Sequence, residues 1–185
     1  MNYNLPFIPE RPAKPRNVGL TMVMDKGLSL SETEGFIESS AEFVDFVKLG
    51  FGTSLITNKL KQKIKLYQKG GIRPYLGGTL FEVFIIRGLF NDFVRFVSDL
   101  GLDLVEVSDG SMKMDNKVKC DYISKLSEKF TVISEVGSKQ ADVIIPDDEW
   151  VAMMKREVEA GSWKVIAEAR ESGNVGIYNA DHSAN

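Results

Sequence analysis

The sequence predicts an α/β protein of the (β/α)8 TIM-barrel type in which about six βα units are present. Short β-rich runs alternate with longer helical runs, this order holds along the chain, and polar or charged residues follow every predicted strand. Strict alternation is typical of a parallel sheet with helical crossovers. An open doubly wound sheet would concentrate such residues at one switch point, whereas a barrel gathers all strand ends around one opening. We therefore expect the barrel.

The expected strands are runs rich in Val, Ile, Leu and Phe that end in polar or glycine-containing turns. They cover residues 18–24, 43–49, 72–76, 102–107, 131–136 and 164–169. The expected helices cover residues 31–41, 53–69, 81–100, 116–129 and 147–160. Ser31 with Glu34 fits a capping box at the first helix, and Gly70-Gly71 closes the second. In the third, Leu89, Phe93, Phe96, Val97 and Leu100 form one apolar stripe at helical spacing.

The chain is expected to have two regions, an N-terminal arm outside the barrel and the barrel domain itself. Residues 1–16 carry Pro6, Pro9, Pro12 and Pro15 and should form an extended N-terminal arm. Residues 17–185 should form one catalytic domain. A complete barrel typically needs about 250 residues, so we expect this domain to lack its last two βα units at the C-terminus.

Composition excludes several classes of function. The net charge is −3 and no basic tract is present, so we expect no nucleic-acid partner. No apolar run approaches the ~20 residues that a membrane span needs. Cys120 is the single cysteine, which rules out an intramolecular disulfide and a cysteine-based metal cage and favours a reducing, cytoplasmic location. The single histidine, His182, lies in a polar tail and is a poor candidate for a catalytic base.

Three glutamates lie within apolar strands near their C-terminal ends: Glu106, Glu135 and Glu168. A glutamate directed at the covering helices would be a costly unpaired buried charge. Directed at the barrel opening, the three carboxylates converge, and oxygen-rich convergence suits Mg²⁺. The competing interpretation is that these glutamates form structural ion pairs with lysines of the barrel.

Cations and glycines follow the same strand ends. Lys26, Lys48, Lys139 and Arg170 end or follow strands and suit an anionic substrate, Arg by bidentate binding and Lys as a point charge or proton donor. Gly77 and Gly78 precede a helix and can present backbone N–H groups to an anion. Neither a P-loop nor a dinucleotide-binding fingerprint is present, so we expect no nucleotide cofactor.

Taken together, the strand-end segments resemble the phosphosulfolactate synthase family. The matching segments are DKGLS (25–29), DFVKLGFGTSL (45–55), GGTLFE (77–82), VEVSDGS (105–111), SEVGSK (134–139) and VIAEARESG (165–173). The resemblance implies a (β/α)8 barrel, a homo-oligomer, and Mg²⁺-dependent addition of sulfite to phosphoenolpyruvate. Two departures stand out. Phe51 replaces an expected tryptophan, and the family continues for two more strands.

The resemblance and the residue pattern together give an expected mechanism. Mg²⁺ lies among Glu106, Glu135 and Glu168, and sulfite adds to C3 of phosphoenolpyruvate to form an enolate-like intermediate. A lysine with a lowered pKa then protonates C2; Lys139 is favoured for this role, with Lys48 as the alternative. Arg170 and Lys26 bind anionic groups. The remaining residues expected to contact substrate are Asp25, Gly77, Gly78 and Ser108.

Two other functions remain open at this stage. A non-catalytic, stress-associated protein of the same family would keep the scaffold without the reaction. A barrel lyase or aldolase acting on another phosphorylated 2-oxo acid would use a Schiff-base lysine instead of a metal-bound enolate.

Overall fold

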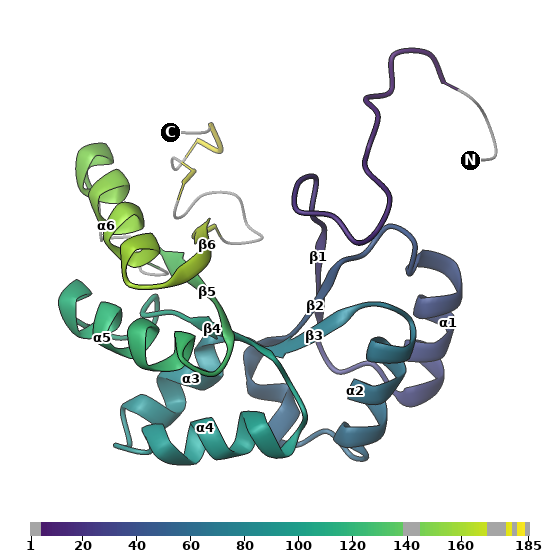
Figure 1. The fold of residues 1–185 in the computed structure, drawn as a ribbon, viewed down its shortest axis with the longest axis horizontal. Coiled ribbons are helices and arrows are strands. Elements are labelled where there is room, and N and C mark those ends of the chain that lie inside the picture. The colour runs from purple at the N-terminus through teal and green to yellow at the C-terminus, as the bar shows by residue number, and fades with distance from the viewer. Residues whose placement is uncertain (1–4, 139–144, 170–176, 179–180, 184–185) are drawn as a thin grey trace.

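The computed structural model describes residues 5–138, 145–169, 177–178 and 181–183. In this part of the chain six parallel strands form one sheet in the order β1-β2-β3-β4-β5-β6. The sheet curves, and helices cover its convex side (Figure 1). This half-barrel confirms the expected fold class. The strands are β1 (Met22–Asp25), β2 (Phe46–Leu49), β3 (Arg73–Leu76), β4 (Leu104–Val107), β5 (Thr131–Val136) and β6 (Ser162–Ala167).

The helices follow the strands in regular alternation. They are α1 (Leu30–Ser40), the 3-10 helix η1 (Gly50–Leu55), α2 (Leu60–Lys69), α3 (Gly78–Ile85), α4 (Phe90–Asp99), α5 (Asn116–Ser127) and α6 (Asp147–Glu159). Their apolar sides pack on the outer face of the sheet, where Val47, Leu49, Val105, Val107 and Val132 meet Ile64, Phe81, Phe93 and Ile123. Burial of this continuous apolar layer is the main favourable contribution to the stability of the fold.

Three local expectations were wrong. The predicted helix over residues 81–100 is two helices, because the chain turns at Gly88, which has φ +69°. The predicted second helix, residues 53–69, is instead the end of the 3-10 helix η1 followed by α2, because Lys59 between them has a left-handed backbone with φ 58°. The first helix begins earlier than expected, and its capping box is formed by Ser29 and Glu32.

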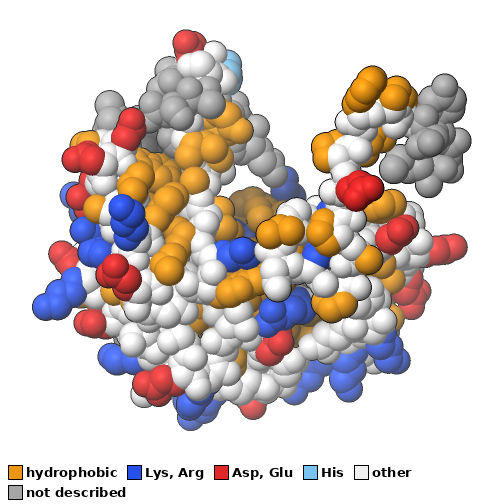
Figure 2. Space-filling view, turned by 45° about the horizontal axis from the view of Figure 1, so that its top comes forward, with side chains coloured by type: hydrophobic (Ala, Val, Ile, Leu, Met, Phe, Trp, Pro, Cys, Tyr) orange, Lys and Arg blue, Asp and Glu red, His pale blue; other side chains and the backbone are white. Residues whose placement is uncertain are grey.

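The N-terminal arm is fixed to the strand N-termini by cations. The Lys14 ammonium donates to the carbonyl oxygens of Ala41, Val44 and Gly71, and Arg16 pairs with Asp45. Arg11 also binds Asp45 and the Phe43 carbonyl, and before Arg11 the arm stands away from the body of the molecule with its apolar side chains exposed (Figures 1 and 2). The arm therefore closes part of the N-terminal end of the sheet and leaves the C-terminal strand ends uncovered.

Candidate active site

The concave face of the sheet has an apolar layer with a polar layer directly above it. The apolar layer consists of Tyr75, Leu104 and Ile133, with Phe46 and Ile166 packed against it. Side chains along a strand return to the same face every second residue. Two positions after each of these five residues in the sequence stand Lys48, Gly77, Glu106, Glu135 and Glu168. The concave face therefore carries one lysine and three glutamates at the C-terminal ends of the strands, as the sequence predicts.

Lys48 is the centre of this polar layer. Its ammonium lies 2.7 Å from Glu106 Oε1 and 3.1 Å from Glu135 Oε2. Burial by itself lowers the pKa of Lys48, but the charges of Glu106 and Glu135 outweigh it and raise the pKa above its ordinary value. This direction is opposite to the lowered pKa expected of a catalytic acid, and it keeps the Lys48 ammonium protonated.

Two consecutive glycines make room for this arrangement. Lys48 reaches from β2 to β4 across β3, and a Cβ added at Gly77 would lie 3.0 Å from Lys48 Cε. The Gly78 backbone N–H donates to Glu106 Oε1 at 2.6 Å. A Cβ added at Gly78 would lie 2.3 Å from Ser108 Oγ. Gly78 is also the first residue of α3, where the helix dipole favours a negative charge.

The glycines thus serve a different partner from the one expected. We predicted that the backbone N–H groups after β3 face a substrate anion. In the structure the Gly78 N–H instead binds the protein's own Glu106 carboxylate. This bond, together with Lys48, compensates for the complete burial of that carboxylate.

The loop that follows β4 is held by a residue that the sequence interpretation did not single out. Glu82 on α3 is 3% exposed, and its carboxylate accepts hydrogen bonds from the Ser108 hydroxyl and the Ser111 backbone N–H. Ser108 is itself fully buried. Glu82 therefore fixes the loop beside the Lys48 cluster. Its position in the segment GGTLFE was visible in the sequence, but only the fold shows that it faces β4.

The two residues predicted after β1 lie in different environments. Asp25 faces α2, where its carboxylate pairs with Lys63 and accepts a 2.9 Å hydrogen bond from the Tyr67 hydroxyl. It is 1% exposed and also accepts the backbone N–H groups of Gly27 and Leu28. The structure therefore does not bring Asp25 together with the Lys48 cluster. Lys26 is exposed, with its ammonium 5.9 Å from the centre of the Phe51 ring at the rim of the strand ends.

The remaining predicted residues lie at the end of the described chain. Glu168 is 4% exposed and directly follows β6, where its backbone N–H donates to the Val136 carbonyl at 2.8 Å. Its Cβ lies so close to Gly137 that an added Cβ there would be 2.6 Å away. Lys139 and Arg170 lie outside the described residues.

The predicted magnesium site can be tested against these carboxylates. Among the described residues no three acidic, histidine or cysteine side chains lie close enough together to hold a metal ion. Glu106 is fully buried and bound by Lys48 and Gly78. Of the three predicted ligands this leaves Glu135, in β5, and Glu168, directly after the neighbouring strand β6, on the same face of the sheet. Mg²⁺ commonly binds one or two carboxylates and completes its shell with substrate oxygens and water, so these residues fit such an ion.

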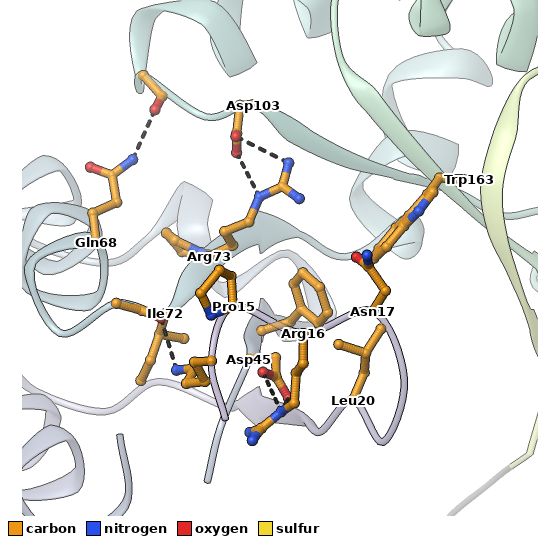
Figure 3. A pocket seen from close by; sticks show the side chains of 15 residues that line it. Pro15, Arg16, Asn17, Leu20, Asp45, Gln68, Ile72, Arg73, Asp103 and Trp163 are labelled. Carbon is orange, nitrogen blue, oxygen red and sulfur yellow. Dashed lines mark hydrogen bonds and ion pairs between the residues drawn. The ribbon is translucent and has the colours of Figure 1, made fainter. Parts of the chain in front are cut away.

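A cavity of about 750 Å³ lies at the opposite, N-terminal end of the strands. Figure 3 shows two pairs of charged side chains in it, Arg16 with Asp45 and Arg73 with Asp103. Trp163 lies at the side of the cavity. In barrels of this type the chemistry occurs at the C-terminal face and the N-terminal face contributes stability. We therefore place the candidate active site at the Lys48 cluster.

Comparison with known proteins identifies the family. The family model described as (2R)-phospho-3-sulfolactate synthase (ComA) matches residues 9–185. The chain belongs to this family. It is 40% identical over 172 residues to the phosphosulfolactate synthase of Bacillus subtilis, covering 92% of this chain and 68% of the relative. It is 36% identical over 177 residues to the phosphosulfolactate synthase of Methanothermobacter thermautotrophicus, covering 92% of this chain and 69% of that relative.

Membership of the (2R)-phospho-3-sulfolactate synthase family confirms the resemblance found in the sequence, and the matched family members are longer than this chain. This chain is similar, in fold alone, to a solved structure of the carboxyl transferase domain of Rhizobium etli pyruvate carboxylase. Its TM-score is 0.52 at 12% identity, over 80% of this chain and 27% of that chain. None of the helices in the described ranges has the length and apolar character of a membrane span.

Proposed function

We propose that this chain carries out the reaction of its family by adding sulfite to C3 of phosphoenolpyruvate. The observation that carries the proposal is the Lys48–Glu106–Glu135 cluster at the strand ends of a barrel whose residues 9–185 match the family. The sulfur lone pair forms the new C–S bond while the C2–C3 double bond opens. Charge then builds on C2 and on the adjoining carboxylate, and a proton delivered to C2 completes phosphosulfolactate.

Electrostatic stabilisation of that developing charge is the main task of such a site. The Lys48 ammonium is fixed by two carboxylates, so it is oriented before substrate arrives and needs little reorganisation during the reaction. Its raised pKa makes it a poor proton donor. This supports a role for Lys48 as a fixed positive charge and favours Lys139 as the acid that protonates C2.

We further propose that Mg²⁺ takes part, with Glu135 and Glu168 as the residues that would hold it. A bound Mg²⁺ supplies Lewis-acid polarisation of a substrate carboxylate. Glu106 serves instead to hold Lys48, because its carboxylate is fully buried and bound by Lys48 and by the Gly78 N–H. Lys26, at the rim, and Arg170 are proposed to attract the anionic groups of the two substrates.

The test is product analysis. The protein is incubated with phosphoenolpyruvate and isotopically labelled sulfite in the presence of Mg²⁺, and NMR follows the C3 carbon. We expect a new C–S bond only when both substrates are present, and its loss in the Lys48→Met variant. Borohydride trapping with substrate is the control for a Schiff-base enzyme. Formation of a trapped lysine adduct without any C–S product would overturn the proposal in favour of a lyase or aldolase.

A further inference from the structure

Lys119, on the inner side of α5, is a buried cation that the proposed reaction does not use. It is 1% exposed, and its ammonium has three acceptors within the described chain. These are Glu135 O at 2.6 Å, Asp109 Oδ1 at 2.7 Å and Glu157 Oε1 at 2.9 Å. An ammonium has three N–H donors, so each is satisfied by a different element: β5, the loop after β4, and α6.

Two of these acceptors belong to the frame of the candidate active site. Glu135 carries the carboxylate that binds Lys48, and Lys119 holds the backbone carbonyl of the same residue. Asp109 follows Ser108, whose hydroxyl donates to Glu82 on a different helix, α3. The loop after β4 is therefore fixed by Glu82 from α3 and by Lys119 from α5.

A gain in folding stability alone does not account for the ion pair between Lys119 and Glu157. Glu157 on α6 is fully buried, and α6 packs beside α5 (Figure 1). Burial by itself lowers the pKa of Lys119, but the carboxylates of Asp109 and Glu157 outweigh burial and raise it, so Lys119 stays charged. Desolvating two charges is expensive, and replacing a buried ion pair by apolar residues of similar volume is often neutral or stabilising. Asn116 also donates to Glu157 at 3.0 Å, so this carboxylate is firmly oriented.

We propose that Lys119 is a positioning residue that sets the place of Glu135 and of the loop after β4, and thereby orients Lys48 toward substrate. The inference rests on the proposed function, because it assigns Lys119 a task in that same site. Lys119 acts through the Glu135 backbone and the Asp109 side chain. A misplacement of about 1 Å in a catalytic group can cost roughly 100-fold in rate, so the loss of these two bonds should be visible in kcat.

The decisive variant removes both buried charges at once. Lys119→Met/Glu157→Leu replaces the pair with apolar side chains of similar length, so the free energy of unfolding in urea should remain close to that of the unchanged protein. We expect kcat for C–S bond formation to fall about 10- to 100-fold, with a smaller change in KM. Lys119→Arg keeps a donor for the Glu135 carbonyl and should recover part of the lost kcat. Lys117→Met, an exposed lysine on the same helix, is the matched control.

A second readout does not depend on activity. Hydrogen exchange of backbone amides 108–111 and 135–138 should be faster in the double variant than in Lys117→Met, because both segments lose an anchor. A double variant with unchanged kcat and unchanged exchange would overturn the positioning role. If the unchanged protein forms no C–S product, the proposed function fails while exchange still decides whether Lys119 orders these segments. Equal exchange in the two variants would then overturn the inference.

Discussion

Lys48 on β2 forms its 2.7 Å ion pair with Glu106 on β4 by passing over Gly77, the residue that follows the intervening strand β3. The pair therefore depends on the absence of a side chain at one position. It also depends on Glu135, which lies on the next strand and binds the same ammonium. The three strand ends are thus coupled through one cation, and this coupling makes the candidate site sensitive to changes that add volume or remove charge.

Removal of the Lys48 charge should affect both stability and activity. Lys48→Met leaves Glu106 fully buried with the Gly78 N–H as its described donor. Breaking a buried pair typically costs about 3–5 kcal/mol, so we expect a loss of this size in urea unfolding. The double variant Lys48→Met/Glu106→Gln should recover most of the stability without recovering C–S bond formation. Recovered activity in the double variant would contradict the role of Lys48 as a fixed positive charge.

The two glycines before α3 should respond to alanine in a graded way. At Gly78 the added Cβ would lie 2.3 Å from Ser108 Oγ and 2.7 Å from Glu106 Oε1, both in buried groups. We expect Gly78→Ala to cost about 1–3 kcal/mol of stability, as overpacking does, and to abolish most turnover. Gly77→Ala meets the flexible Lys48 side chain at 3.0 Å and should cost less stability while displacing Lys48.

Gly35→Ala is the control for these two variants. Gly35 lies within α1, and an added Cβ there has no atom within 4 Å. Alanine in a helix interior is favoured over glycine by roughly 0.5–1 kcal/mol, so this variant should be slightly more stable and fully active. The measurements are thermal unfolding and initial rates. Equal effects of all three substitutions on activity would show that the crowding around Glu106 has no functional consequence.

The sequence was most informative about residues whose charge and whose position in a strand predict the same face of the sheet. Glu106 and Glu135 are charges inside apolar strands. Because an unpaired charge against the covering helices is costly, they are expected on the concave face, where the structure has them. β5 has the predicted bounds, because Thr131–Val136 is bounded by Phe130 and by Gly137 with φ +131°. The break between α3 and α4 was missed because apolar residues are frequent both before and after Gly88, so this single glycine did not mark a turn.

The helix-borne members of the polar network could not be predicted in the same way. Glu82 and Lys119 lie on helices, and their partners lie on other elements, up to 38 residues away along the chain. No local period distinguishes a charged side chain that faces a strand end from one that faces solvent. Asp25 differs from the glutamates, because this strand-end aspartate turns toward the covering helix α2 and binds Lys63 there.

The metal proposal predicts different effects on Mg²⁺ affinity for substitutions at Glu168 and Glu106. Glu168→Gln should weaken Mg²⁺ binding, measured by calorimetry with phosphoenolpyruvate present, because one of two proposed carboxylate ligands is lost. Glu106→Gln should leave Mg²⁺ affinity nearly unchanged, since its carboxylate is buried under Lys48. Both variants should lose turnover, for different reasons. Unchanged Mg²⁺ affinity and activity in Glu168→Gln would sink the assignment of Glu168 as a ligand.

Asp25 gives a prediction about acid stability. Although burial alone acts to raise its pKa, hydrogen bonds from Lys63, Gly27, Leu28 and Tyr67 outweigh burial and lower it. A carboxyl group with a lowered folded-state pKa contributes stability that is present above the unfolded value, here 3.8, and is lost as the pH falls through the folded value. Asp25→Asn should therefore cost roughly 3–5 kcal/mol at pH 7 and progressively less below about pH 4.

The corresponding measurement is urea unfolding of Asp25→Asn between pH 3 and pH 7, with Tyr67→Phe as the matched control. Tyr67→Phe removes one neutral donor but keeps the Lys63 pair, so its cost of about 1 kcal/mol should change little with pH. Because Asp25 faces α2 and not the Lys48 cluster, the KM values for both substrates should remain unchanged in whatever fraction of Asp25→Asn stays folded. A large rise in KM at full stability would instead place Asp25 in contact with substrate, as the sequence first predicted.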